Sequence, residues 1–313
     1  MDFIISHWGV IATTLGVVTT IWGIVAIIPG LMDILARPGN RFHVRQILSR
    51  ADPDLVGIDL LQSRFFSSDV ADEMGEIRRY VSGSRQGPAD KEDSRPFFIA
   101  LALKYRGIVV GYLTAEYFQH SQVIFLWYLL VDHTAVPQYT LQQRGSLMLI
   151  EALVKAADAT GVPWEHVVTE VESAPTDIMT AKAKMLLFSN AAEELSRRHN
   201  RPVVRVFRLP IRYRQPILHI EQLASAREHE VPEWLLYAPR SIGGRLVEEN
   251  GKVIMTRPMA TELLDTLLIK GYAHAFAHSA EYVAYIRKMF DEYVAQLPEQ
   301  LALEDNPRAL VAI

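Results

Sequence analysis

The sequence contains no cysteine, and its charge is close to balanced. The absence of cysteine excludes disulfides, thiolate metal sites and a cysteine nucleophile. The net charge is −4 with 22% charged residues, so there is no basic surplus and we expect no nucleic-acid partner. The 313 residues, half of them hydrophobic, are enough for one or two domains with a substantial core.

The N-terminal region lacks charged side chains. No Asp, Glu, Lys or Arg occurs from Phe3 to Met32. At about 1.5 Å per residue this run can cross a hydrocarbon core of about 30 Å, so we expect a membrane contact through residues 4–28. The run has neither the basic start nor the cleavage site of a secretory signal peptide. The alternative is a buried helix of a soluble protein, although such helices are usually shorter and interrupted by polar positions.

Arginine is concentrated after the apolar run. The four arginines are Arg37, Arg41, Arg45 and Arg50. By the positive-inside rule, this asymmetry predicts a single-pass protein of the inner (cytoplasmic) membrane. The N-terminus would lie outside, and the rest of the chain would lie in the cytoplasm.

Glycine recurs within the apolar run at a strict spacing of seven residues, at Gly9, Gly16, Gly23 and Gly30. On a helix this spacing builds one stripe of small residues, which lets two helix backbones approach closely in lipid. A seven-residue period indicates a left-handed crossing. We therefore expect a homo-oligomer formed through these glycines. The alternative is chance, because glycine is common in membrane helices.

The hydrophobic period changes several times after the anchor (1–36) and a connector (37–51). A helix is expected over 54–82 and an exposed polar loop over 83–96. Three strand-like runs with tight connections follow, and further strands then alternate with helices. The expected strands are 96–107, 108–118, 123–132, 164–172, 203–213 and 234–238, and the expected helices are 141–160 and 180–198. This order predicts an α/β (α+β) fold with a mixed central sheet flanked by helices.

The C-terminal region, 241–298, is expected to form a hairpin followed by helices. Asn250-Gly251 between two alternating runs is a strong hairpin signal, because both residues tolerate positive φ. Helices are expected over 260–272 and 280–296, and the tail 299–313 is expected to lack regular structure. His274 and His278 are four residues apart, but the spacing supplies no third ligand, so no metal site is expected.

The expected helix at 141–160 has Gln142, Gly145 and Leu147 near its start, directly after a strand and its loop. A glycine at a strand-to-helix turn lets backbone N–H groups approach a phosphate, and the helix N-terminus adds partial positive charge. This segment resembles the pyrophosphate-binding turn Gln/Arg-x-x-Gly-x-Gly/Ala of the GNAT N-acetyltransferase family. Gln142 and Gly145 match that turn, whereas Leu147 is bulkier than the family's Gly or Ala.

A second stretch is also similar to this family. Many bacterial GNAT proteins have Glu-Val-Glu-x-x-Pro on the next strand and Tyr-x-Gln-Pro further on. This sequence has Glu170-Val171-Glu172 before Pro175, and Tyr-Arg-Gln-Pro at 213–216. The resemblance covers about residues 52–240 and implies a GNAT-like domain that uses acetyl-CoA or a longer acyl-CoA. The donor-binding residues it implies are Leu129, Leu130, Val131, Gln142, Gln143, Arg144, Gly145 and Ser146.

The resemblance implies direct acyl transfer to an amine, in which a base takes the amine proton and an acid protonates the leaving thiolate. The candidate bases are Glu116, Glu170 and Glu172. The last two share a strand face, and a paired carboxylate near an apolar site can have a raised pKa. Phe188 stands where the family has its acidic tyrosine. The acid would then be Tyr128, Tyr117 or a water.

Two functions remain open at the level of sequence. The first is a membrane-tethered GNAT-type N-acyltransferase that acts on an amine acceptor. The second is a catalytically degenerate GNAT-like sensor or scaffold whose self-associating helix acts as a membrane effector or signalling subunit, for example in bacterial defence. Leu147 and Phe188 favour the second function, because they depart from the family at positions that serve the cofactor and the chemistry. The retained Glu-Val-Glu strand favours the first.

Overall fold

The computed structural model describes residues 42–65, 77–78, 80–81, 96–132, 134–135, 139–172, 188–190, 192–194, 196–197, 205–243 and 245–305. The expected membrane helix and its four glycines lie outside the described residues. Among the helices that are described, none is long and apolar enough to cross a membrane.

The chain divides into two compact units. The described residues of the first are 42–43 and 104–108, where the Phe42 and Tyr105 rings lie 5.0 Å apart. The second unit contains the remaining described residues.

The main sheet of the protein has nine strands and is mixed. Its order is β1-β2-β3-β4-β5-β8-β6-β12, and β7 pairs separately with β8. The strands are β1 (Phe42–Gln46), β2 (Phe97–Tyr105), β3 (Ile108–Phe118), β4 (Val123–Val131), β5 (His166–Glu172), β6 (Phe207–Arg208), β7 (Arg214–Gln215), β8 (Val231–Pro239) and β12 (Glu304–Asp305). β3 and β4 are antiparallel, whereas β4 and β5 are parallel and are joined through the helix α4 (Tyr139–Asp158). The predicted mixed sheet is confirmed.

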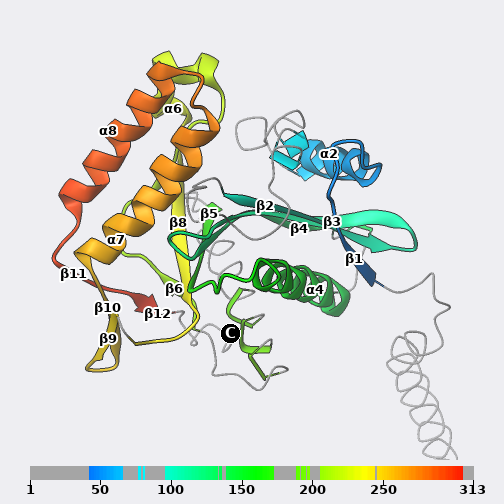
Figure 1. Ribbon diagram of the computed structural model, residues 1–313, viewed down its shortest axis with the longest axis horizontal. Coiled ribbons are helices and arrows are strands. Elements are labelled where there is room, and N and C mark those ends of the chain that lie inside the picture. Colours follow the sequence, from blue (N-terminus) through cyan, green and yellow to red (C-terminus); the bar gives the residue numbers. More distant parts are fainter. Residues whose placement is uncertain are drawn as a thin grey trace, which may run out of the picture. The chain divides into compact units, whose positions relative to one another are not determined.

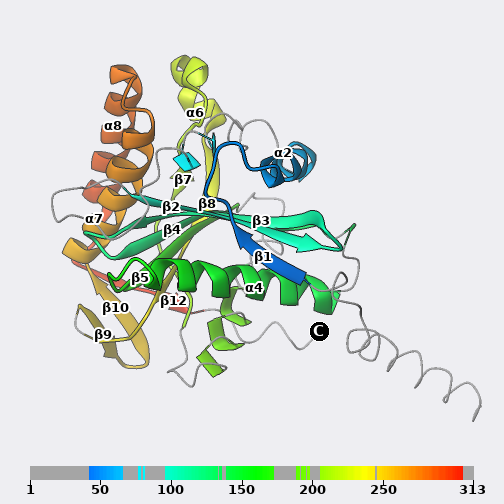
Figure 2. The same ribbon diagram turned by 45° about the vertical axis from the view of Figure 1, so that its right-hand side comes forward.

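Helices cover both faces of this sheet. α2 (Asp54–Phe65) and α4 lie on opposite faces (Figures 1 and 2). α2 buries Leu55, Ile58 and Leu61 in a cluster with Tyr112 of β3 and Tyr128 of β4. Its spacing of apolar residues therefore matches the face that it buries.

The C-terminal hairpin forms where Asn250-Gly251 predicts it. β9 (Leu246–Glu249) pairs with β10 (Lys252–Thr256), and the two turn residues have φ of 50° and 75°. The helices α7 (Arg257–Leu264) and α8 (Ala280–Gln296) follow, with the π-helical segment η3 (Asp265–Ala273) continuing directly from α7. Both predicted helices are confirmed. The short helices η2 (Ile220–Ser225) and α6 (Ala226–His229) precede β8.

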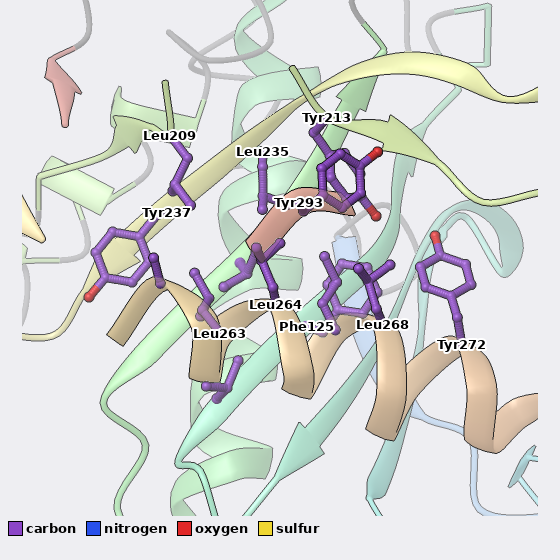
Figure 3. Close-up of a cluster of buried hydrophobic side chains, with 14 of the residues drawn as sticks. Phe125, Leu209, Tyr213, Leu235, Tyr237, Leu263, Leu264, Leu268, Tyr272 and Tyr293 are labelled. Atoms are coloured by element: carbon purple, nitrogen blue, oxygen red, sulfur yellow. The ribbon is translucent and has the colours of Figure 1, made fainter. Parts of the chain in front are cut away.

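The C-terminal helices and the main sheet share one core. Figure 3 shows Leu263, Leu264 and Leu268 packed toward Phe125 of β4 and Leu235 of β8, all of which belong to a single buried cluster. The apolar face of this helical region is therefore buried against the sheet rather than in a core of its own.

Four of the predicted elements differ from the structure. The connector over 37–51 contains strand β1. The strand expected over 203–213 is only β6 and ends before Pro210, which has no N–H to donate, whereas β8 is longer than the expected 234–238. The expectation of an unstructured tail is wrong for 300–305, because β11 (Gln300–Ala302) pairs with β10 and β12 pairs with β6.

Candidate active site around Glu170

β4 and β5 separate partway along their length. Their pairing runs from Val123–His166 to Leu126–Thr169, yet β4 continues to Val131. β5 continues instead beside β8, with Glu172 opposite Glu233. The edge of β4 that faces β5 therefore has no strand partner beyond Leu126 within the described residues.

A bulge accompanies this separation. The β3–β4 register shifts between Thr114 and Ala115, which leaves Trp127 as an extra residue in β4. Bulges bend a strand and often lie beside active sites. Leu129, Leu130 and Val131, the backbone positions predicted to hold the donor carbonyl, lie half-buried on this unpaired stretch.

Glu170 lies on β5 just beyond the last residue paired with β4, and three side chains donate hydrogen bonds to its carboxylate. They are the hydroxyl of Tyr213, the hydroxyl of Tyr272 at 2.7 Å and Nε2 of Gln215 at 3.3 Å. Burial raises the pKa of Glu170 to about 7, and the three hydrogen bonds oppose that rise. A carboxylate with this pKa exchanges protons near neutral pH.

Different elements supply the two tyrosines. Tyr213 precedes β7, and its backbone oxygen accepts from the Glu233 N–H at 3.1 Å. Tyr272 lies near the end of η3, where its ring packs edge-on against Trp127 with centroids 4.9 Å apart. Figure 3 shows Tyr272 at the edge of the cluster, with its hydroxyl directed away from η3. Burial raises the pKa of both hydroxyls well above the usual value, so each stays protonated and donates to Glu170.

Glu116 lies close to the turn of η3 that carries Tyr272. Glu116 is buried on β3, and its Oε2 lies 4.0 Å from the place where a Cβ on Gly271 would be. Gly271 immediately precedes Tyr272, so the predicted bases Glu116 and Glu170 both approach this turn. The third candidate, Glu172, is the last residue of β5, and its side chain lies outside what the structure describes.

The two tyrosines predicted as acids are buried. Tyr128 packs in the α2 cluster, with its ring 6.2 Å from that of Tyr112. The Tyr117 hydroxyl donates to the Val162 carbonyl at 3.1 Å, and burial raises its pKa to about 12. Tyr117 therefore has a structural role.

The residues expected to bind phosphate lie in the first turns of helix α4. α4 begins at Tyr139, so Gln142, Gln143, Arg144, Gly145 and Ser146 already lie within the helix. Only the first four N–H groups of a helix lack an intrahelical partner, so the N–H of Gly145 is not free for a phosphate.

Packing explains the glycine at position 145. A Cβ there would lie 2.8 Å from Cδ2 of Leu103, so Gly145 lets α4 approach β2 and β4 closely. Leu147 is buried and does not crowd a surface turn. The close approach of Leu103 thus accounts for the glycine at position 145.

Asp132 holds the loop after β4 in place. Its Oδ1 accepts from the backbone N–H groups of Thr134 at 2.7 Å and Ala135 at 3.1 Å, and Arg64 of α2 donates to Oδ2 at 3.3 Å. Burial acts to raise the pKa of Asp132, but a hydrogen bond from the Thr134 hydroxyl at 2.7 Å, the two backbone N–H groups and the Arg64 charge lower it overall. The end of the unpaired stretch is thereby tied to α2.

Sequence reasoning missed the partners of Glu170. Tyr213 and Gln215 belong to the Tyr-Arg-Gln-Pro motif, which drew attention to the segment without indicating its partner. Tyr272 follows Glu170 by 102 residues and carries no motif. A single tyrosine outside any motif does not indicate in the sequence that its hydroxyl will bond a distant carboxylate.

Neither models of known protein families nor curated protein sequences match the chain. Among solved structures, a Bacteroides thetaiotaomicron protein assigned to the GNAT acetyltransferase family is 14% identical with a TM-score of 0.42, covering 73% of this chain and 98% of its own. The ribosomal-protein-S18-alanine N-acetyltransferase of Escherichia coli is 14% identical with a TM-score of 0.37, covering 67% and 100%. A Salmonella typhimurium protein assigned as an acetyltransferase, solved with acetyl-CoA, is 10% identical with a TM-score of 0.37, covering 67% and 99%. Values this low establish no function for this chain.

Proposed function

We propose that this protein transfers an acyl group from an acyl-CoA donor to an amine acceptor, with Glu170 as the general base. The observation that carries the proposal is the position of Glu170, a carboxylate with a pKa of about 7 beside the gap between β4 and β5. General bases work best when their pKa lies near the working pH. The GNAT-like order of strands also supports acyl transfer.

The ionised Glu170 carboxylate takes the proton of the acceptor amine, and Tyr213 and Tyr272 hold that carboxylate in place. Backbone N–H groups on the unpaired stretch of β4 hold the donor carbonyl. The donor supplies the thioester. Phe188 cannot donate a proton, and the raised pKa values of Tyr213 and Tyr272 make them poor acids. Tyr128 or a water therefore remains the candidate acid on sequence grounds.

We also propose that the N-terminal apolar helix tethers this domain to the cytoplasmic face of the inner membrane, and that its glycine stripe joins copies of the chain. The support is the charge-free run of thirty residues followed by arginine. A tether raises the local concentration of any acceptor that resides in the membrane.

The catalytic proposal can be tested by release of CoA thiol from acetyl-CoA across a panel of amines. Because the chain has no cysteine, a thiol-reactive dye reports the released CoA without a background from the protein. Glu170→Gln should lower kcat/KM by about 10²–10⁴. In the unmutated chain, kcat/KM should rise with pH through about 7, because only the ionised carboxylate accepts a proton.

The matched control is Glu248→Gln, since Glu248 is exposed on β9. Its turnover should equal that of the unmutated chain. Turnover by Glu170→Gln at the unmutated rate would remove Glu170 as the base. Calorimetric binding of acetyl-CoA with no turnover on any amine would favour the sensor or scaffold function instead.

A further inference from the structure

A cavity of about 570 Å³ lies on the α4 side of β5. Its walls are apolar and come from α4, β5, β8 and the segments around 188 and 206. They include Ile150, Val154, Val167, Phe188, Val206 and Leu236. The volume falls within the roughly 300–1,000 Å³ that is usual for small-molecule sites.

At one end the cavity reaches Thr169, the residue of β5 next to the gap between β4 and β5. Thr169, which lines it, is the last residue of β5 that pairs with β4, and its hydroxyl donates to the Leu126 carbonyl at 3.1 Å. At the other end the cavity reaches Glu165 and Trp164, just before β5. Four residues of strand span about 13 Å, so the cavity runs from the gap along much of β5.

Two ion pairs border the cavity. Lys155 contacts Glu151 at 2.8 Å, and Arg240 lies 3.9 Å from Asp158. Glu165 is a further charged side chain in the lining, so both cations are balanced by carboxylates and most of the remaining wall is apolar. A ligand that fills this space should be uncharged, apolar and long in one direction.

We propose that this cavity binds the hydrocarbon chain of a medium- or long-chain acyl donor whose thioester lies at the gap between β4 and β5. The inference rests on the proposed acyl transfer and names its donor class. The amine nitrogen attacks the thioester carbonyl, so a C–N bond forms and the C–S bond breaks. The amine proton passes to Glu170, and the thiolate leaves to be protonated. Each methylene buried in the cavity should raise kcat/KM roughly fourfold.

The test compares acetyl-, hexanoyl- and decanoyl-CoA with the full chain, again by thiol release. In the unmutated protein kcat/KM should rise along this series. Val154→Phe places a ring in the cavity and should lower the ratio of decanoyl to acetyl kcat/KM at least tenfold. Ala159→Phe is the matched control, because Ala159 is exposed just beyond α4 and should leave that ratio unchanged.

A second variant covers the case in which Val154→Phe fails to fold. Phe188→Ala enlarges the cavity and should shift the preference toward longer chains. Equal kcat/KM for all three donors, or a ratio that neither variant changes, would overturn the acyl-chain site while leaving acetyl transfer in place. Absence of turnover with every donor would overturn the proposed function itself, and the inference with it.

Discussion

At the residue scale, the carboxylates of Asp132 and Glu170 show how the surroundings of a group set its pKa. Asp132 accepts from two backbone N–H groups and lies beside the Arg64 charge, and its pKa is lowered. Among the described residues, Glu170 accepts from the neutral groups of Tyr213, Gln215 and Tyr272, and burial outweighs these hydrogen bonds, so its pKa rises to about 7. The difference lies mainly in desolvation, which outweighs the hydrogen bonds at Glu170 but not at Asp132, and it leaves Glu170 able to change protonation at neutral pH.

The hydrogen bond from Tyr272 should set the pH at which Glu170 ionises. This bond lowers the Glu170 pKa, so Tyr272→Phe should raise that pKa further above its usual value. The midpoint of the pH profile of kcat/KM should therefore move upward from about 7. Below the midpoint, activity should fall about tenfold for each pH unit.

The control for this shift is Tyr237→Phe. The Tyr237 hydroxyl contacts Nδ1 of His166 at 2.9 Å and does not contact Glu170. Its removal should leave the midpoint in place even if stability falls. A Tyr272→Phe profile with an unchanged or lowered midpoint would show that Tyr272 does not act on the Glu170 carboxylate.

At the scale of elements, the last strands link the two sheets. β11 extends the small sheet through β10, and β12 pairs with β6 in the main sheet. Leu301 and Leu303 alternate with exposed residues and are buried in the core shared with the C-terminal helices. This alternation is the signal that marks 300–305 as strand.

Because Leu301 is almost fully buried, Leu301→Ala should lower the free energy of unfolding by about 2–5 kcal/mol. Urea denaturation followed by circular dichroism measures the change. Gln300→Ala, at an exposed position on the same strand, should change stability by less than about 0.5 kcal/mol. Equal effects of the two substitutions would mean that β11 is not part of the cooperative core.

At the scale of the whole molecule, one buried cluster connects the sheet to the C-terminal helices. It extends along the chain from Phe118 to Leu303. The region that contributes this packing also contributes Tyr272 to the candidate site. Removing the C-terminal helices would therefore expose the sheet, and it would also remove the hydrogen bond that Tyr272 donates to Glu170.

The proposed assembly also belongs to this scale. Replacing Gly16 and Gly23 together by Leu should weaken oligomers in detergent, because bulkier side chains hold two helix backbones apart. Analytical ultracentrifugation of the full chain measures the change. Replacing Ile11 and Val18 by Leu, off the glycine stripe, is the control. Oligomers that persist unchanged in the glycine variant would end the argument for the stripe.

Local pattern was sufficient for much of the fold. The period-2 runs placed β2, β3 and β4, the helical period placed α4 and α8, and Asn250-Gly251 placed the hairpin, because each depends on neighbours close in sequence. Glu116, Glu170 and Glu172 became candidate bases because the resemblance to the GNAT family implies a base for the acceptor amine.

The environment of Glu170 could not be predicted from local sequence pattern. Its pKa depends on burial and on three donors from distant segments, and hydrophobic periodicity does not indicate which hydroxyl reaches which carboxylate. Gly145 shows the same limit, because the length of α4 and the approach of Leu103 decide that this glycine serves packing. Residue types and their spacing thus indicated the elements and the candidate chemistry, whereas contacts between remote segments set the protonation and the shape of the site.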